Sequence, residues 1–593
     1  MIPEHLQPYL VIIVIVVSFV LIIREQLRPA ISFLIANLIF IVFGVLTAGE
    51  VLLGFSNESI ISIILLILLA AGLQKNFNLE TLLDQFYRKR HTYQSFLLVM
   101  MAKVAVISSF LNNTPVVAAM TPYVVNWGKK RNIAPSKLLI PLSFATIWGG
   151  MITLIGTSTT LVLNGFLSEK GLEFNLIHLL IVGVSVCITG ILFMTIFGHR
   201  LLPDHSDVVD DFNKNPREYL VETQLMKNSS LIDKTVHAAG LRQLKGIYLV
   251  EIIRGQSTIS PVEPTEVIQD NDTLIFAGDT TQIMELIQSN PEIQLPKHAD
   301  ALSQETVALT EVVIGPNSGL IGKKVRFSDF RNLYDAAIVA VHRNGEKLSG
   351  KIGDIRMRTG DLLLLLAGDQ LKNRIDLYRD LYVISKKKKV TPPGKTKIYS
   401  LAIVALLSIV LLLLGYFPLI VSLMLIFTLM AGLKMITMQD IKREVDINLV
   451  AILVFSLALG NAVIKTGAGD MIATLMIDFF SPFGVEGILI ALLVITTMLT
   501  SFISNVGAVS ITFPLAYALS NSLGLPGAPF YLAIAYAASA AFLTPIGYQT
   551  NLIIYGPGGY KFRDFMKIGF PVTLVYLGTV FMVIRLLYPS AFD

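Results

Sequence analysis

Two long apolar segments of this chain are each interrupted by the same kind of polar, helix-breaking stretch. The first stretch is SFLNNTP (residues 109–115), and the second, SFISNVG (501–507), follows it at an offset of 392. Lipid offers no hydrogen-bond partner to a freed backbone group, so such a break survives only where it is buried in protein or lines a cavity. A matched pair of broken segments in the two halves of a membrane protein indicates the substrate site of a transporter.

Composition agrees with a membrane location. Of the 593 residues, 53% are hydrophobic and only 15% are charged, whereas soluble proteins carry about 25% charged residues. Several apolar segments reach the roughly 20 residues that a bilayer-spanning helix requires. The net charge of +5 is distributed along the chain rather than gathered in a patch. We therefore expect lipid, and not nucleic acid, to be a partner.

Nothing in the sequence indicates an enzyme. No nucleophile and base stand in a recognisable arrangement, and the eight histidines show no metal-ligand spacing. The GPGG stretch at 556–559 lacks a following Lys-Ser/Thr, so it is interpreted as a turn and not as a phosphate-binding loop. The single cysteine, Cys187, excludes an intramolecular disulfide. We predict no catalytic residues and no cofactor other than a coupling ion.

Apolar runs predict membrane spans in two series. Spans are expected near 9–23, 29–47, 59–74, 136–166 and 175–197, and again near 398–414, 417–433, 448–464, 528–555 and 566–588. The interrupted segments, near 94–126 and 484–520, are predicted to be re-entrant helical hairpins. Short interfacial helices are expected at 79–90 and 470–480.

The distribution of Lys and Arg predicts the orientation of these spans. Basic runs at 88–90, 129–131 and 386–389 fall on one side together with the hydrophilic middle of the chain. Positive residues mark the cytoplasmic side, so both termini lie outside and the two hairpins enter from opposite sides. The halves are then inverted repeats, an architecture of many alternating-access carriers in the cell (inner) membrane.

A second motif aligns the two halves independently. GTSTTL (156–161) matches GYQTNL (547–552) at an offset of 391. Two separate polar motifs with nearly equal offsets indicate a duplicated unit. We therefore assign residues 1–203 to a first membrane repeat and residues 397–593 to a second.

The polar middle of the chain carries a repeat of its own. Short alternating strands are expected, and NSSLI (228–232) matches NSGLI (317–321) at an offset of 89. DTLIFAGD (272–279) matches DLLLLLAGD (361–369) with one inserted residue. We predict two small α+β domains in the cytoplasm, at 204–300 and 301–396, followed by a basic linker.

The quoted motifs resemble a known family. GGMITLIGTST (149–159) and TPIGYQTN (544–551) are similar to the divalent anion:sodium symporter (DASS) family, most closely its sulfate-permease-like branch. The middle resembles a tandem pair of TrkA-C domains, a domain order typical of this branch. The resemblance implies a homodimer formed through a scaffold of helices. It also implies a scaffolding role for the soluble pair or the binding of a small regulatory ligand, since such domains bind nucleotides in other proteins.

The family carries a Ser-Asn-Thr motif in each hairpin, where sodium and the anion bind. Here the motifs read NNT (112–114) and SNV (504–506), so each departs at one position, and Val506 lacks a hydroxyl group. The resemblance assigns these residues to the substrate: Asn112, Asn113, Thr114, Ser504, Asn505, Gly507, Thr544 and Pro545.

Broken helices provide the chemistry that a buried dianion requires. Helix N-termini offer free backbone N–H groups and a positive dipole end, and they replace the water that the anion loses. Pro115 fits the first position of a new helix, where its missing N–H costs nothing. Gly507 is expected to give close backbone approach. The alternative is that these residues only kink or join helices.

Sodium takes oxygen ligands such as amides, hydroxyls and exposed carbonyls. Two ligand sets are expected: Asn113, Gly156, Thr157, Ser158 and Thr159 in the first half, and Asn505, Gly547, Thr550 and Asn551 in the second. No Asp or Glu stands out in the middle of these spans. Because proton-coupled carriers usually show a buried ionisable relay, sodium is favoured over protons.

These observations predict a symporter that imports a divalent oxyanion, sulfate being favoured, by alternating access with sodium. One alternative is a carrier of dicarboxylates or other anions, with either sodium or protons as the driving ion. Alternatives of another class are a regulated channel, although no selectivity-filter sequence is present, and a membrane sensor that binds the anion without moving it.

Overall fold

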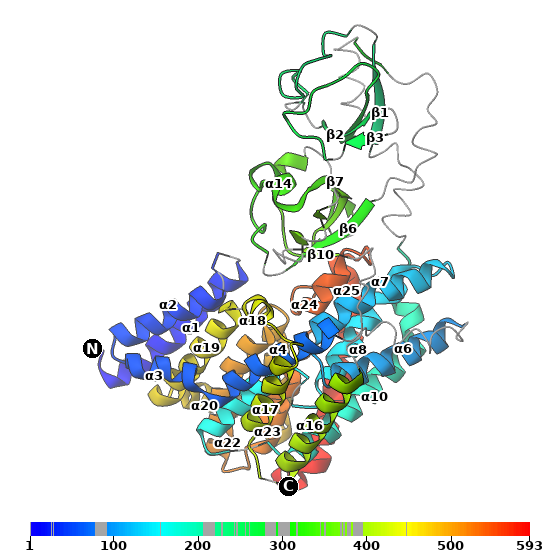
Figure 1. The fold of residues 1–593 in the computed structure, drawn as a ribbon. Coiled ribbons are helices and arrows are strands. Elements are labelled where there is room, and N and C mark those ends of the chain that lie inside the picture. The colour runs from blue at the N-terminus through cyan, green and yellow to red at the C-terminus, as the bar shows by residue number, and fades with distance from the viewer. Residues whose placement is uncertain are drawn as a thin grey trace.

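The structure, a computed structural model, consists of a large helical part and two small β-sheet units (Figure 1). It describes residues 2–24, 26–27, 29–76, 92–154, 156–172, 174–205, 220–226, 229–241, 244, 247–254, 257–259, 261–278, 292–294, 309–315, 318–343, 346–348, 352–367, 370–371, 374–375, 381–383, 395–414, 416–445 and 447–592. The expected helix at 79–90 lies outside the described residues.

The helical part repeats one series of elements. The first series is α1 (Gln7–Ile23), α2 (Pro29–Val42), α3 (Ala48–Leu52), α4 (Glu58–Asn76), α6 (Tyr93–Ser108), α7 (Asn113–Lys129), α8 (Leu139–Gly150), α9 (Ser158–Glu169) and α10 (Leu176–Leu201). The second is α16 (Lys395–Leu413), α17 (Leu419–Gly432), α18 (Met438–Glu444), α19 (Ile447–Thr466), α20 (Ala468–Phe480), α21 (Gly484–Thr500), α22 (Asn505–Leu523), α23 (Ala528–Ala537), α24 (Gln549–Tyr555) and α25 (Phe562–Leu587). Apart from α20, each helix of the second series begins 386 to 392 residues after its counterpart.

Local sequence explains why paired helices begin where they do. Thr47 starts α3 with a capping box, in which its hydroxyl accepts from the Glu50 amide and the Glu50 carboxylate accepts from the Thr47 amide. Thr437 and Asp440 repeat this box at the start of α18. A capping box satisfies amide groups that the first turn of a helix leaves free, so the same signal sets both helix starts.

Two expected spans are each divided into two helices. The segment 136–166 contains α8 and α9, separated by residues 151–157, and the segment 528–555 contains α23 and α24, separated by residues 538–548. Each half thus has one broken helix in addition to its interrupted hairpin, in which α6 meets α7 or α21 meets α22.

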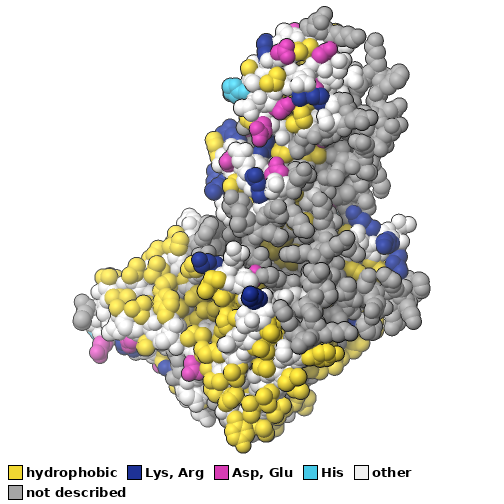
Figure 2. Space-filling model, in the orientation of Figure 1, with side chains coloured by type: hydrophobic (Ala, Val, Ile, Leu, Met, Phe, Trp, Pro, Cys, Tyr) yellow, Lys and Arg dark blue, Asp and Glu magenta, His cyan; other side chains and the backbone are white. Residues whose placement is uncertain are grey.

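The centre of the helical part is formed by α8 and α23. Every residue of α8 is buried, and so are residues 529–537 of α23. Apolar side chains on the outer helices are instead exposed, among them Ile177 on α10 and Leu406 on α16. Figure 2 shows hydrophobic side chains spread over the visible face of the helical part. Among the described residues, six helices are long and apolar enough to cross a membrane, as expected for a multi-pass membrane protein.

The two sheet units have the same topology. The first has strand order β3-β2-β4-β1-β5 and the second β8-β7-β9-β6-β10, with all pairs antiparallel. Their strands are β1 (Leu220–Leu225), β2 (Ile247–Arg254), β3 (Ser257–Ile259), β4 (Thr273–Gly278), β5 (Ile293–Gln294), β6 (Leu309–Ile314), β7 (Ala336–Arg343), β8 (Glu346–Lys347), β9 (Leu362–Ala367) and β10 (Leu381–Val383). Register shifts between 249 and 251 and between 338 and 340 lie 89 residues apart. Strands β4 and β9 correspond without an inserted residue.

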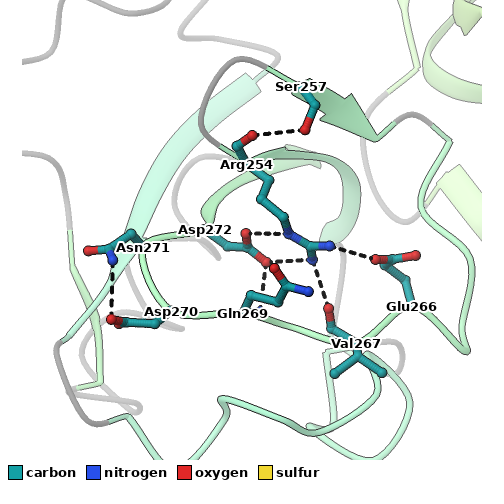
Figure 3. A network of polar contacts seen from close by, with 8 residues as sticks. All are labelled: Arg254, Ser257, Glu266, Val267, Gln269, Asp270, Asn271 and Asp272. Carbon is teal, nitrogen blue, oxygen red and sulfur yellow. Dashed lines mark hydrogen bonds and ion pairs between the residues drawn. The ribbon is translucent and has the colours of Figure 1, made fainter.

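An ion pair between a half-buried arginine and a buried aspartate forms at the same place in each unit. In the first unit, the Arg254 guanidinium donates two hydrogen bonds of 2.9 Å to Asp272, which is fully buried (Figure 3). Arg343 and Asp361 form the matching pair in the second unit, at 2.7 and 2.8 Å. The hydrogen bonds that both arginines donate to the aspartates raise the pKa of the arginines. Each aspartate also accepts from a backbone amide three residues before it, so the turns that lead into β4 and β9 are fixed.

The second sheet unit contacts the helical part at the end of α24. A Cβ atom added to Gly556 would lie 2.8 Å from Leu362 Cβ and 3.3 Å from the Gly360 carbonyl oxygen. Tyr382, on β10, packs against the core of the helical part. Gly360 has a φ of +81°, a conformation that glycine adopts without strain. Glycines on both sides therefore permit this close contact.

Candidate functional site

The two hairpins end in tips of matching structure: tip 1 (residues 109–114) and tip 2 (501–506). In both tips the first, third and fifth residues are buried, whereas the second and fourth are exposed. The buried fifth residues, Asn113 and Asn505, expose only 1% and 5% of their surface. The tips thus follow one pattern in two halves, and an asparagine side chain is held inside each.

Both helices that leave the tips begin at these asparagines, α7 at Asn113 and α22 at Asn505. The expectation that Pro115 occupies the first position is wrong, since it is the third residue of α7. Its missing N–H still costs nothing, because the first four amides of a helix have no intrahelical partner. At tip 2 the Ser504 hydroxyl caps the helix by accepting from the Gly507 amide at 3.2 Å.

The side-chain orientation of each asparagine is fixed by a hydroxyl group five residues earlier. Ser108 donates to Asn113 Oδ1 at 2.5 Å, and Thr500 donates to Asn505 Oδ1 at 2.9 Å. Gly150 makes room for the first arrangement, because a Cβ atom there would lie 2.5 Å from Asn113 Oδ1. Both amide oxygens are engaged, so the Nδ2 groups are the donors that remain for other partners.

A threonine ties the loop of each broken helix to the tip of its own half. Thr544 donates to the Ser501 carbonyl at 2.6 Å and accepts from the Gly547 amide at 3.1 Å. Thr153 makes the same two bonds in the first half, to the Ser109 carbonyl and from the Gly156 amide. Thr153 was not predicted as a site residue. The sequence does contain a signal for it, because Thr153 lies 391 residues before Thr544, at the offset that relates the two halves.

Close backbone approach occurs at glycines of these loops and not at Gly507. A Cβ atom added to Gly547 would lie 2.9 Å from the Thr500 carbonyl oxygen, and one added to Gly156 would lie 2.4 Å from that of Gly150. At Gly507 the nearest atom is the capping Ser504 hydroxyl at 3.3 Å. Within the protein, close backbone packing therefore occurs at Gly156 and Gly547, whereas the approach of a ligand to the backbone at Gly507 stays a prediction.

Contacts between the halves bring tip 1 against the loop that leads into α24. Asn113 Nδ2 donates to the Tyr548 hydroxyl at 2.9 Å, and the Thr114 hydroxyl donates to Gln549 Oε1 at 3.2 Å. Because Thr544 and Gly547 in the same loop contact tip 2, residues 544–549 lie against both tips. The structure thus joins most of the predicted residues in one connected region.

The predicted sodium ligands occupy different environments. Thr157 caps α9 and accepts from the Thr159 amide at 3.4 Å. Thr550 and Asn551 are fully buried and bond to the Ser143 hydroxyl on α8, at 2.9 and 2.7 Å. Asn551 Nδ2 also donates to the carbonyl groups of residues 541 and 544. Through these contacts, Thr550 and Asn551 hold the loop of residues 544–549 in place.

The remaining predicted residues differ in exposure. Asn112 and Ser504 are exposed, Ser158 and Thr114 are half-buried, and Pro545 is buried. Within the described part of the chain, no three His, Cys, Asp or Glu side chains gather in a cluster that could hold a metal ion. The polar groups around the tips are hydroxyls, amides and backbone groups, which suit an anion at helix N-termini and a hard cation at carbonyl oxygens.

Comparison with known proteins gives one consistent result. The chain matches the family model described as citrate transporter (CitMHS) over residues 19–476 and again over residues 403–593. A protein of Chlamydomonas reinhardtii named putative sulfur deprivation response regulator is 31% identical over 557 residues, 91% of this chain and 95% of the relative. An uncharacterized transporter of Synechocystis sp. is 29% identical over 98% of this chain and 97% of its own length. The probable sodium/sulfate cotransporter 3 of C. reinhardtii is 22% identical over 94% and 86%, respectively. The chain therefore belongs to the citrate transporter (CitMHS) family of membrane transporters.

Proposed function

We propose that the chain is a secondary active symporter that imports a divalent oxyanion, with sulfate as the favoured substrate and sodium as the coupling ion. The observation that carries the proposal is the pair of matched tips, each with a buried asparagine at the start of a helix. The names of relatives such as sodium/sulfate cotransporter 2 support the choice of substrate and ion.

The anion would bind most strongly at tip 2. Asn505 begins the 19-residue helix α22, and its Nδ2 donates to no residue within the described part of the chain. A free amide donor at a helix N-terminus suits a negative ligand. The exposed Ser504 hydroxyl and the backbone around Gly507 would complete the contacts, and Asn112, Asn113, Thr114, Thr544 and Pro545 would surround them.

Sodium would bind beside each tip, at oxygen atoms of the broken helices. The first set would be Asn113, Gly156, Thr157, Ser158 and Thr159, and the second Asn505, Gly547, Thr550 and Asn551. Amide, hydroxyl and carbonyl oxygens suit this cation. Thr550 and Asn551 would contribute mainly through the loop that they support.

For the arrangement in the membrane, we propose the architecture of the sulfate-permease-like branch of the DASS family, which the sequence resembles. The hairpins would be re-entrant, residues 1–203 and 397–593 would form inverted repeats, and residues 204–300 and 301–396 would be cytoplasmic TrkA-C-like domains. The protein would lie in the cell membrane as a homodimer, with a core that carries the site moving against a scaffold.

Uptake of labelled sulfate into proteoliposomes tests the proposal. We expect saturable uptake that an inward sodium gradient stimulates, that a potassium gradient does not, and that excess unlabelled sulfate inhibits. Uptake driven by a proton gradient without any effect of sodium would contradict the coupling ion. Preferential uptake of dicarboxylates would contradict the substrate.

A second candidate is an anion sensor in the membrane. It is favoured by the name of the C. reinhardtii relative, putative sulfur deprivation response regulator, which is 31% identical to this chain. Saturable binding of labelled sulfate without counterflow across proteoliposomes would support the sensor and contradict the carrier.

A further inference from the structure

The side-chain donors of tip 1 are engaged by two adjacent residues of the second half. The Tyr548 hydroxyl accepts from Asn113 Nδ2 at 2.9 Å, and Gln549 Oε1 accepts from the Thr114 hydroxyl at 3.2 Å. Asn113 Oδ1 is held by Ser108 at the same time. The Thr114 hydroxyl proton and one of the two Asn113 Nδ2 hydrogens are thus occupied, and an anion at tip 1 could take either of them only by displacing an internal partner.

Tip 2 lacks the corresponding partners. The positions equivalent to Tyr548 and Gln549 are Thr157 and Ser158, and Thr157 caps its own helix. Asn505 Oδ1 is held by Thr500, but no described residue accepts from its Nδ2. The position equivalent to Thr114 is Val506, which has no hydroxyl. The two tips share a backbone pattern and differ in which donors are free.

This difference bears on the shape of the anion. An extended dicarboxylate carries charge at two ends and needs donors from both tips, whereas a tetrahedral dianion presents its charge on one small surface. A site rejects a ligand when its groups must give up internal partners to bind it. We propose that Tyr548 and Gln549 determine specificity by closing tip 1, so that the site selects a compact tetrahedral dianion over an extended dicarboxylate. This inference rests on the proposed function.

Tyr548→Phe tests the proposal because it removes one hydroxyl and keeps the ring. Freeing Asn113 Nδ2 adds one hydrogen bond to a charged ligand, so inhibition of sulfate uptake by succinate should become roughly tenfold stronger. The KM for sulfate should change less than threefold. Gln549→Ala alters an exposed residue and should shift selectivity in the same direction, which provides a test should Tyr548→Phe fail to fold.

Tyr93→Phe is the matched control. It removes a hydroxyl group that donates to the Lys137 carbonyl at 3.0 Å, away from the tips, and should leave the ratio of succinate to sulfate inhibition unchanged. If Tyr548→Phe and Gln549→Ala keep the wild-type ratio while the wild type transports sulfate, the specificity role is refuted and the proposed function stands. A wild type that prefers succinate would refute both.

A different observation concerns the second sheet unit and α24. This helix has only seven residues, so at 1.5 Å per residue its ends lie roughly 10 Å apart. Gln549 at one end bonds to tip 1, and Gly556 beyond the other end contacts Leu362 and Gly360 of the sheet unit. The buried Asp361, paired with Arg343, fixes the turn that makes this contact by accepting from the Arg358 amide. A continuous series of contacts thus runs from the sheet unit through α24 to the candidate site.

We infer that the second sheet unit acts on transport by holding α24 in the position seen here. Alternating access requires the elements of the site to move between states. A contact that forms in just one of these states stabilises that state relative to the other. The GPGG turn supplies the contact surface, since a side chain at Gly556 would collide with Leu362. A change in the sheet unit would then alter transport without altering the residues at the tips.

A cysteine pair, Leu362→Cys with Gly556→Cys in a Cys187→Ser background, tests this role. The two Cβ positions are 2.8 Å apart, and a shift of about 1 Å gives the usual disulfide separation. Oxidation should form the bond, detected by mass spectrometry, and sulfate uptake should fall at least fivefold and recover on reduction. The control is each single-cysteine variant measured before and after oxidation, which separates the effect of the bond from that of the collision between Gly556→Cys and Leu362. Absence of the bond, or unchanged uptake in the bonded protein, would refute the inference.

Discussion

Ser143, on α8 of the first half, donates its hydroxyl to Asn551 Oδ1 in the second half at 2.7 Å. A serine hydroxyl has one proton, so the 2.9 Å contact with Thr550 is one in which Ser143 accepts. Ser143, Thr550 and Asn551 are all fully buried. This short chain of hydrogen bonds joins α8 of the first half to the start of α24 in the second half, directly after the loop of residues 544–549.

Ser143→Ala should therefore weaken the protein and the site together. Removing the hydroxyl leaves the buried Asn551 oxygen without its donor, at a cost of about 1–3 kcal/mol in the free energy of unfolding. Thermal denaturation of the purified protein in detergent measures this loss. Ser185→Ala, which removes a hydroxyl on the exposed side of α10, should change stability far less. Equal effects of the two substitutions would contradict the role given to Ser143.

Asn505→Asp should abolish anion binding while keeping the fold. The new side chain has nearly the same shape and can still accept from Thr500, but it replaces the free amide donor with a negative oxygen. Like charges facing each other in a partly buried site repel strongly, so we expect at least a hundredfold loss in sulfate affinity. Asn521→Asp, at an exposed position on the same helix, is the control for added charge. Wild-type affinity in Asn505→Asp would remove this residue from the site.

The sequence predicted the tips because their signal is local. A polar break inside an apolar run is visible in one dimension, and two nearly equal offsets related Asn113 to Asn505 and Gly156 to Gly547. Thr153 follows from the same offset once Thr544 is chosen. The start of α7 was misplaced by two residues because proline is tolerated anywhere in the first turn of a helix.

Contacts between the halves could not be predicted in this way. Ser143 meets Asn551, and Asn113 meets Tyr548, across separations of 408 and 435 residues. These pairs depend on how α8, α24 and the tips pack in three dimensions, and no periodicity in the sequence encodes that packing. The difference between the tips arises from Tyr548 and Gln549, which stand inside the motif that made the halves look alike.

Asp361→Asn should destabilise the second sheet unit and its contact with α24. Replacing the buried carboxylate leaves the half-buried Arg343 without its counter-ion and weakens the hydrogen bonds that it donates, which costs about 1–3 kcal/mol. Limited proteolysis of the full-length protein should show faster cleavage between residues 301 and 396. Asp354 forms ion pairs near the surface with Lys324 at 3.4 Å and with Arg326 at 3.2 Å. Each such pair contributes about 0–1 kcal/mol, so Asp354→Asn is the control. Equal cleavage rates in the two variants would contradict this account.

Thr153→Val and Thr544→Val should impair transport to similar extents, because the two residues play the same part in each half. Valine keeps the shape of threonine but removes the hydroxyl that joins Ser109 to Gly156, or Ser501 to Gly547. Each substitution removes the threonine hydroxyl from a carbonyl of the tip and an amide of the loop, at a cost of about 1–3 kcal/mol, and loosens the loop against its tip. We expect sulfate uptake in proteoliposomes to fall at least tenfold for either variant. Thr428→Val, which removes a hydroxyl bonded within the exposed face of α17, should transport normally. If only one of the two variants lost activity, the loops would not be functional equivalents, and the symmetry of the two hydrogen-bond sets would be structural alone.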